Sequence, residues 1–169
     1  AGLVRGVVLR ISSVYGVGAW ANLEQIPGRM VVEHINNGTI TLISSTNIRT
    51  PGGQVVDLIH VRDVCNAIVK VIRNPHRARG HVLNISSGRG MSVRGVAHMV
   101  DRIVCKGRKR SLRYLSGFRS TEMIRRLVLS NTQAKSIIGW QPMISLQQGI
   151  QEMADYVQSR RTNQQTGLG

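Results

Sequence analysis

Residues 54–86, QVVDLIHVRDVCNAIVKVIRNPHRARGHVLNIS, contain the clearest signals of the fold class of this chain. The run from Gln54 to Val61 is rich in β-branched residues and has the length of a buried strand. A predicted helix follows, which Asn74-Pro75 ends. Its apolar side chains recur at helical spacing: Val61, Val64, Cys65, Ile68, Val71 and Ile72. A second apolar run, from His81 to Ser86, predicts another strand. A strand, a helix and a strand in this order are typical of α/β proteins with a parallel sheet.

The residues before this stretch continue the alternation of strands and helices. GVVLRIS, at residues 6–12, predicts another buried parallel strand, and residues 13–25 predict a loop. Pro27 suits the first turn of a helix, which ends at Gly38. Thr39–Ile43 predicts the next strand.

The residues after it predict helices with capping signals. Ser92 is a candidate N-cap for a helix whose apolar face runs to Val104. Short strands are favoured at residues 111–115 and 127–129, and the polar residues from Ser159 onward predict a frayed tail. Two more helices follow from capping boxes, in which a Gln stands three residues after a Ser: Ser130 with Gln133, ending at Gly139, and Ser145 with Gln148.

The chain is strongly basic. Its 169 residues carry a formal net charge of +15, with 41% hydrophobic and only 4% aromatic residues. The hydrophobic fraction excludes a disordered chain, and no apolar run reaches the roughly 20 residues of a membrane helix. Such charge attracts polyanions, either nucleic acid or a diphosphate, but without interleaved aromatics it offers no stacking platform for single strands. The basic residues form three clusters: Arg73, His76, Arg77 and Arg79; Lys106, Arg108, Lys109, Arg110 and Arg113; and Arg119, Arg125 and Arg126.

Cysteine and histidine usage predicts neither a metal centre nor secretion. Cys65 and Cys105 both fall in predicted helices, where we expect buried, reduced thiols and a cytoplasmic location. The histidines are scattered without the spacing of metal ligands. The first residues lack the pattern of a signal peptide, and because they open on Ala1 we expect the true start to lie upstream.

Four segments share their residues and their order with one family. They are LRISSVYGVG at residues 9–18, DLIHVRDV at 57–64, VLNISSG with MSV at 82–93, and the pattern from Ala134 to Ile150 that contains IGWQP and SLQQGI. Together they resemble the NAD-dependent epimerase/dehydratase family, the sugar-nucleotide branch of the extended short-chain dehydrogenases/reductases. The resemblance covers nearly the whole chain, from Val7 to Val157.

Two features of that family are missing from these residues. The family opens with a strand, a GxxGxxG turn and a helix that bind the cofactor pyrophosphate, and it acts through a Tyr-x-x-x-Lys pair. No such glycine spacing occurs here, and no tyrosine has the lysine: Tyr15, Tyr114 and Tyr156 are followed four residues later by Ala19, Phe118 and Arg160. The resemblance therefore implies the C-terminal half of an enzyme, without catalytic residues of its own and inactive alone.

The resemblance also implies how the chain is divided. It would form the C-terminal part of a Rossmann-like, doubly wound parallel sheet plus a smaller α/β substrate-binding subdomain. Residues 1–90 would hold the last strands and helices of the NAD-binding sheet, interrupted by a substrate-domain insertion at about 17–53. Residues 91–158 would form the substrate-binding subdomain, and 159–169 the tail. Alone, the first strand and the Val61–Ile72 helix should expose an apolar patch that the other half would cover.

Ligands follow from the same resemblance. The parent enzyme would be a homodimer that binds NAD or NADP mainly through the missing half and a nucleoside-diphosphate sugar between the halves. Ser12, Ser13 and Val14 match the loop that passes the nicotinamide. Ser13 also stands where many relatives bind the sugar nucleotide through an Asn, and its hydroxyl has the same hydrogen-bonding ability with a shorter reach. The alternative for Ser13 is an ordinary polar loop residue.

Two further places in the sequence correspond to substrate contacts. Thr41, Leu42 and Ile43 match the strand that lines the nucleotide base in relatives, although a plain buried strand has the same pattern. Val56 replaces an arginine that usually binds the diphosphate, which puts that contact in doubt. Arg119 lies close to a second diphosphate-binding position, with Arg125 and Arg126 as alternatives and a solvated arginine as the simpler explanation.

A second functional hypothesis uses the charge rather than the motifs. A relative that has lost catalysis could keep the fold and hold RNA or another polyanion on its basic clusters. Affinity that falls steeply with salt would favour this hypothesis, whereas a GxxGxxG turn and a Tyr-x-x-x-Lys pair encoded upstream would favour the enzyme.

Overall fold

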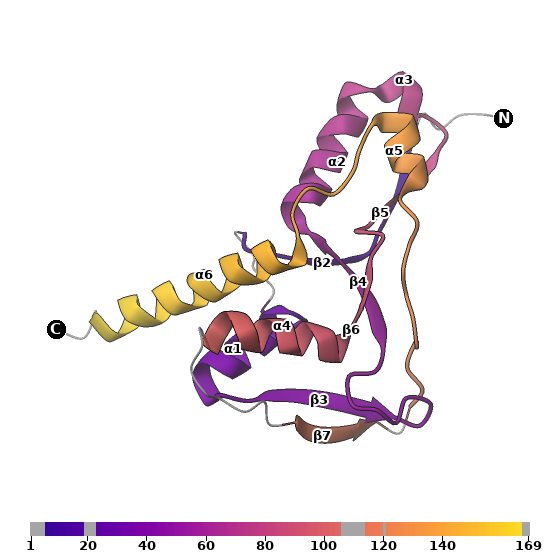
Figure 1. The fold of residues 1–169 in the computed structure, drawn as a ribbon. Helices are drawn as coiled ribbons and strands as arrows, with labels where there is room; N and C mark the ends of the chain where they lie inside the picture. Colours follow the sequence, from indigo (N-terminus) through magenta and orange to yellow (C-terminus); the bar gives the residue numbers. More distant parts are fainter. Residues whose placement is uncertain (1–5, 19–22, 106–113, 120, 167–169) are drawn as a thin grey trace.

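The computed structural model describes residues 6–18, 23–105, 114–119 and 121–166. Residues 54–86 form the expected strand, helix and strand: β4 (Val55–His60), α2 (Val61–Arg73) and β5 (Val82–Ile85), with the short α3 (Pro75–Ala78) between the last two. The strands pair in parallel with one extended segment near the N-terminus, so the predicted α/β class is confirmed. Figure 1 shows α2 and α3 beside these strands.

That extended segment contains two strands where we predicted one. β1 (Val8–Ile11) pairs with β5, and after a bend at Ser12, β2 (Ser13–Tyr15) pairs with β4. The prediction of a loop from residue 13 was therefore wrong for its first three residues. β-Branched Val14 and the buried Tyr15 suit a strand, and pairing with β4 supplies hydrogen bonds that the local sequence does not reveal.

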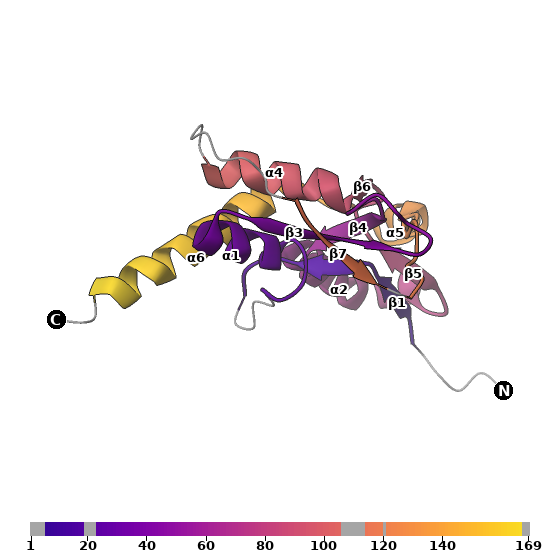
Figure 2. The same ribbon diagram turned by 90° about the horizontal axis from the view of Figure 1, so that it is seen from below.

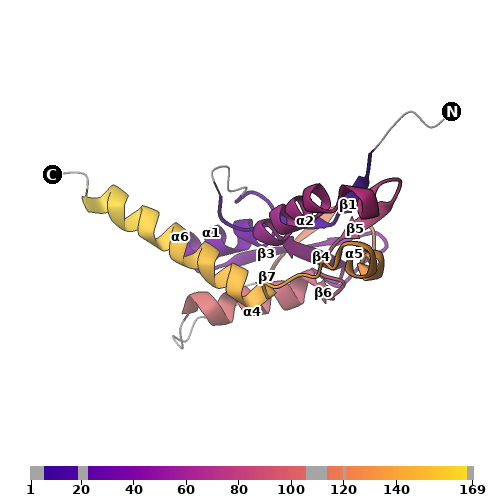
Figure 3. The same cartoon turned by 90° about the horizontal axis from the view of Figure 1, so that it is seen from above.

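A second layer is built from the insertion and the C-terminal part. It contains α1 (Gly28–Asn37), β3 (Ile40–Ser45), β6 (Gly90–Ser92), α4 (Val93–Cys105), β7 (Tyr114–Arg119) and α6 (Leu146–Thr166). β6 extends the β2–β4 sheet in antiparallel direction, and β3 and β7 form a separate parallel pair. Figures 2 and 3 show α2 and α4 on opposite sides of the strands, and Figure 1 shows β3 and β7 along one edge of the molecule.

Two apolar clusters hold these layers together. The larger joins α1, β3, α4 and α6 to β2 and β4 through Tyr15 and Leu58, and Met30, Leu42 and Met153 are among its fully buried members. The smaller joins β4, α2, β5 and α5 (Thr132–Ile138) around Trp140. Although α5 follows residue 90 in the sequence, it packs against β5 and α3 in the smaller cluster.

The C-terminal elements confirm some local signals and correct others. The Ser145–Gln148 capping box forms, and Gly139 ends α5 in the left-handed conformation. The Ser130 box does not form, because α5 begins one residue later than its spacing requires and Asn131 is the N-cap. Residues 127–129 form no strand. The expected frayed tail is helical to Thr166, and one of its contacts is Arg161 donating to the Ile35 carbonyl at 3.1 Å.

Exposure also differs from one sequence-based expectation. Cys105 is buried as expected, but Cys65 is exposed because it lies on the outer face of α2. Among the described residues no helix is both long and apolar enough to cross a membrane.

Candidate functional site

The bend between β1 and β2 separates the three candidate cofactor-binding residues. Ser12 is buried, and its hydroxyl donates to Oδ1 of Asp57 at 3.5 Å. Ser13 and Val14 are exposed on β2, Val14 with 41% of its surface accessible. The Ser12 hydroxyl is thus engaged within the fold, whereas Ser13 and Val14 are available to a ligand.

Asp57 is a buried carboxylate that the sequence analysis did not single out. Only 2% of its surface is exposed, and it accepts hydrogen bonds from the Ser87 amide and hydroxyl at 2.9 and 2.5 Å. It also accepts from the Gly88 amide at 3.2 Å and the Leu129 amide at 3.3 Å. Asp57 therefore joins β4 to the turn after β5 and to the segment before α5. An acid inside an apolar strand must be paired when buried, and this was the available signal.

The remaining candidates share the β3–β7 pair. Thr41 lies opposite Leu115, and Ser45 lies opposite Arg119. The pairing brings Thr41, Leu42, Ile43 and Arg119 onto one two-stranded sheet, away from Ser13 on β2. Arg119 is the last residue of β7, and its side chain lies outside the described part of the chain.

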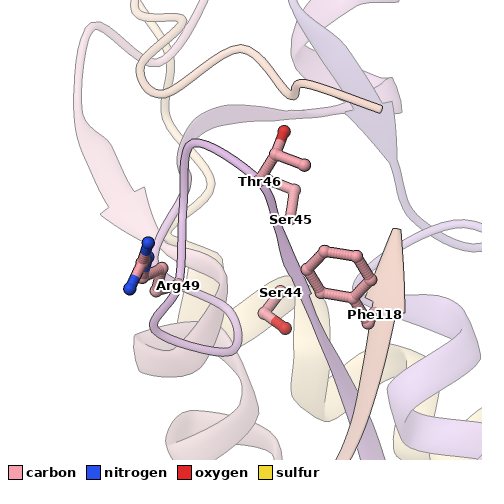
Figure 4. A pocket seen from close by; sticks show the side chains of 5 residues that line it. All are labelled: Ser44, Ser45, Thr46, Arg49 and Phe118. Atoms are coloured by element: carbon pink, nitrogen blue, oxygen red, sulfur yellow. The ribbon is translucent and has the colours of Figure 1, made fainter. Parts of the chain in front are cut away.

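An open hollow of about 530 Å³ lies where β3 and β7 end (Figure 4). Its side chains are those of Ser44, Ser45, Thr46, Arg49 and Phe118. The Phe118 ring has 68% of its surface exposed and lies beside Ser44 and Ser45 in Figure 4. The exposed Phe118 ring can stack on a planar ring, and the Arg49 guanidinium, which lies on the other side of Ser44 and Ser45 in Figure 4, can bind phosphate oxygens.

The strand that leads to this hollow has few free backbone groups. The Thr41 amide donates to the Glu33 carboxylate at 3.1 Å, and the Ile43 carbonyl accepts from the Gly52 amide at 3.0 Å. Leu42 is buried. The accessible groups are therefore Thr46, Arg49 and Phe118, which the sequence analysis missed. The polar run that follows the apolar strand was the signal for them, because ligands of α/β proteins bind at strand carboxyl ends.

Two arginines lie next to the position from which the usual arginine is missing. The Val55 amide donates to the Arg125 carbonyl at 2.8 Å, and the Val55 carbonyl accepts from the Leu127 amide at 2.9 Å. Residues 125–127 thus run beside β4 next to Val56, and both Arg125 and Arg126 are exposed. The chain therefore offers guanidinium groups near this position from another segment.

Tyr15 and His60 form a buried aromatic contact with structural roles. Their ring centroids are 5.3 Å apart, and the Tyr15 hydroxyl donates to the Ser145 carbonyl at 3.4 Å. Burial, followed by the charges of Asp63 and Glu152, raises the pKa of Tyr15, so its phenol stays protonated. A tyrosine that acts as a proton acceptor needs the opposite shift, so Tyr15 fastens the start of α6 rather than transferring a proton.

The basic clusters are only partly described. Arg73, His76, Arg77 and Arg79 are all exposed around the end of α2 and α3. The cluster at 106–113 lies outside the described residues.

Parallel strands joined by a helical crossover, with polar groups at their carboxyl ends, define a Rossmann-like α/β protein. The model of the NAD dependent epimerase/dehydratase family matches residues 1–86 of the 169, and the chain belongs to this family. Both the fold class and the resemblance predicted from the sequence are confirmed. No curated protein matches the chain.

Solved structures show the same fold. The UDP-glucuronic acid 4-epimerase of Bacillus cereus, in complex with UDP-glucuronic acid and NAD, matches 91% of this chain and 45% of its own, with a TM-score of 0.77 and 19% identity. The dTDP-glucose 4,6-dehydratase of Bacillus anthracis, in complex with NAD, matches 92% of this chain and 45% of its own, with a TM-score of 0.73 and 22% identity. The UDP-glucose 4-epimerase of Thermotoga maritima, with UDP-glucose, matches 91% of this chain and 46% of its own, with a TM-score of 0.69 and 22% identity. This chain spans about half the length of each.

Proposed function

We propose that this chain is the C-terminal, substrate-binding part of an NAD(P)-dependent enzyme that epimerises, dehydrates or reduces nucleoside-diphosphate sugars. Family membership supports the class of enzyme. The hollow at the ends of β3 and β7 is the observation that carries the substrate-binding role. The nucleoside would lie on the exposed ring of Phe118, and Arg49, together with Arg126 in place of the arginine missing at Val56, would bind the diphosphate.

The cofactor would touch this chain only at its edge. Ser13 and Val14 offer an exposed hydroxyl and an apolar side chain, which suit the nicotinamide end. The sequence contains no GxxGxxG turn for the pyrophosphate, so the phosphates would be held by other residues of the parent protein. When bound, the nicotinamide supplies a hydride acceptor, and the role of this chain is to position the sugar against it.

An exposed apolar face supports the idea that the parent protein is larger. Val8, Ile11, Val14, Ile68, Val69, Ile72 and Val82, on β1, β2, α2 and β5, each expose at least 40% of their surface. We propose that the rest of the nucleotide-binding sheet covers this face, that the full protein is a homodimer, and that this chain alone turns over no sugar nucleotide.

Titration of the chain with UDP, dTDP and UDP-glucose, followed by NMR, tests the substrate-binding role. Phe118→Ala and Arg49→Ala should each weaken binding by about tenfold, since a stacked base or a phosphate contact contributes roughly 1–3 kcal/mol. The exposed Arg79 on the far α3 side provides the control, because Arg79→Ala removes a similar charge away from the hollow. Binding that all three variants weaken equally would show non-specific attraction to the basic chain and overturn the assignment.

Reading the coding DNA upstream of Ala1 tests the enzymatic role. A strand, a GxxGxxG turn and a Tyr-x-x-x-Lys pair encoded there would support it. An upstream frame lacking both motifs would exclude it.

A non-catalytic polyanion-binding role is the second candidate, supported by the exposed cluster Arg73, His76, Arg77 and Arg79. It requires RNA affinity whose logarithm falls steeply with the logarithm of salt concentration and that drops in Arg77→Ala. RNA affinity that changes neither with salt concentration nor in Arg77→Ala would eliminate this candidate.

A further inference from the structure

Helices α1 and α4 bring together three side chains that the family resemblance does not use. His34 lies on α1, and Asp101 and Cys105 lie one helical turn apart on α4. The His34 Nε2 atom is 2.8 Å from Oδ1 of Asp101 and 3.2 Å from Sγ of Cys105. The thiol of Cys105 also donates to Oδ1 of Asp101 at 3.2 Å. Three different donor atoms thus surround one point.

Spacing in the sequence predicts no metal site here, because the three residues are not close together in the chain. His34 is 67 residues from Asp101 and 71 from Cys105, so only the packing of α1 against α4 creates the cluster. Burial distinguishes it from a chance surface group: His34 is fully buried and Cys105 is 8% exposed. The Asp101 side chain is 24% exposed, which leaves a path to solvent.

An imidazole nitrogen, a thiolate and a carboxylate oxygen are the donor atoms that Zn²⁺ prefers in proteins. We propose that His34, Asp101 and Cys105 bind Zn²⁺, with water as the fourth ligand on the Asp101 side. Binding replaces the hydrogen bonds within the cluster: the Cys105 thiol loses its proton to solvent, and the imidazole proton resides on Nδ1 while Nε2 binds the metal.

The geometry of the three ligands and the residues around them determine how tightly the site should bind Zn²⁺. Tetrahedral ligands of Zn²⁺ at normal bond lengths lie about 3.3–3.6 Å apart, so the cluster must open by about half an ångström, and the partly exposed Asp101 can move. The buried Nδ1 of His34 has no hydrogen-bond partner among the described residues. Metal-binding histidines usually donate from this second nitrogen, and the lack of an acceptor costs about 10–100-fold in affinity. The site should therefore bind zinc more weakly than a closed structural site.

Cobalt(II) is a spectroscopic probe for the site, because a thiolate bound to Co²⁺ gives an intense charge-transfer absorption. Titration of the reduced 169-residue chain with Co²⁺ should produce this absorption at one equivalent, and Zn²⁺ should displace it. C105S should abolish the absorption, and D101N should weaken Co²⁺ binding by about tenfold. The exposed second cysteine provides the matched control, so C65S should leave the titration unchanged.

Thermal unfolding keeps the test meaningful if a substitution at buried His34 disturbs the fold. Zn²⁺ that binds only the native state must raise the Tm of the wild-type chain and of C65S, but not that of C105S, whatever the metal-free stability of each variant. The proposal is overturned if no thiolate absorption appears, if it survives C105S, or if Zn²⁺ stabilises C105S as much as the wild type. In that case the three side chains form only a hydrogen-bonded link between α1 and α4.

Discussion

Among the described residues, Asp57 has the most deeply buried carboxylate. Asp57→Asn replaces one accepting oxygen with a donating NH₂ group opposite amides and hydroxyls that themselves donate. Because the site is 2% exposed, water cannot compensate. We expect a loss of about 2–4 kcal/mol in the free energy of unfolding, measured by urea denaturation.

Asp155→Asn is the matched control for this prediction. Asp155 is exposed on α6 and accepts from Gln151 at 2.9 Å, so the same chemical change should alter stability by no more than about 0.5 kcal/mol. Equal effects of the two substitutions would show that the hydrogen bonds of Asp57 do not stabilise the fold.

Gly149 is a helical residue that alanine should not improve. Alanine in a helix normally gains about 1 kcal/mol over glycine. Here an added Cβ would lie 2.5 Å from the Tyr15 ring and 2.9 Å from the His60 ring, both buried. Gly149→Ala should therefore lower stability by about 1–2 kcal/mol despite the better helix propensity. Gly18→Ala, where nothing lies within 4 Å, should be nearly neutral; a stabilised Gly149→Ala would mean that α6 can move away from β2.

Residues with local partners could be predicted from the sequence, and those with distant partners could not. The Ser145–Gln148 box is complete within four residues and forms as expected. The carboxylate of Asp63, in contrast, accepts from the amides of Met143 and Ile144, about eighty residues away in the sequence. Asp57 and the His34 cluster depend entirely on such long-range packing.

At the scale of elements, His60 links β4 to α2 in a way that depends on pH. It is the N-cap of α2, and its Nδ1 accepts from the Arg62 amide at 3.2 Å, which only the unprotonated nitrogen can do. Burial lowers the pKa of His60 below the usual 6.5, against the opposing effect of Glu152. The unfolded chain then binds the proton more readily than the native state. The contribution of His60 to the free energy of unfolding is therefore fully present above about pH 6.5 and is lost as the pH falls below that value.

His60→Asn should remove this part of the pH dependence, because asparagine is a good N-cap that does not titrate. We expect the unfolding free energy of the variant to fall less steeply between about pH 7 and 5, by at most roughly 1.4 kcal/mol per pH unit relative to the wild type. Parallel curves for the two proteins would show that His60 carries the same charge in both states.

Element boundaries were predictable where one strong signal sets them. The apolar side chains of α2 and the Asn74-Pro75 pair after it predicted both ends of this helix to within one residue. β2 and the last turns of α6 were missed, because the pairing of β2 with β4 and the contact of Arg161 with the Ile35 carbonyl come from the tertiary structure. Polar residues can continue a helix once its first turns are anchored.

At the scale of the molecule, periodicity and motif order predicted the fold class and the family, but not how the layers join. The hollow at β3 and β7 needs two strands that are paired across about seventy residues of sequence, and no local pattern indicates that pairing. The apolar face was predictable, because strands typical of a buried parallel sheet are not buried by the elements this chain contains.

That face leads to a prediction about the whole chain in solution. An apolar face of this extent favours contact between copies, so the chain should self-associate in sedimentation velocity experiments, and increasingly so at higher concentration. Ile72 has 69% of its surface exposed on α2, so Ile72→Gln should reduce association without lowering stability. Ile124 is almost as exposed, at 67%, but it lies after β7, outside the apolar face. Its neighbour Met123 accepts a hydrogen bond from the Asn47 side chain. Ile124→Gln should therefore leave association unchanged. A monomeric wild type, or an equal effect of both substitutions, would show that the face defined by β1, α2 and β5 is not a contact surface.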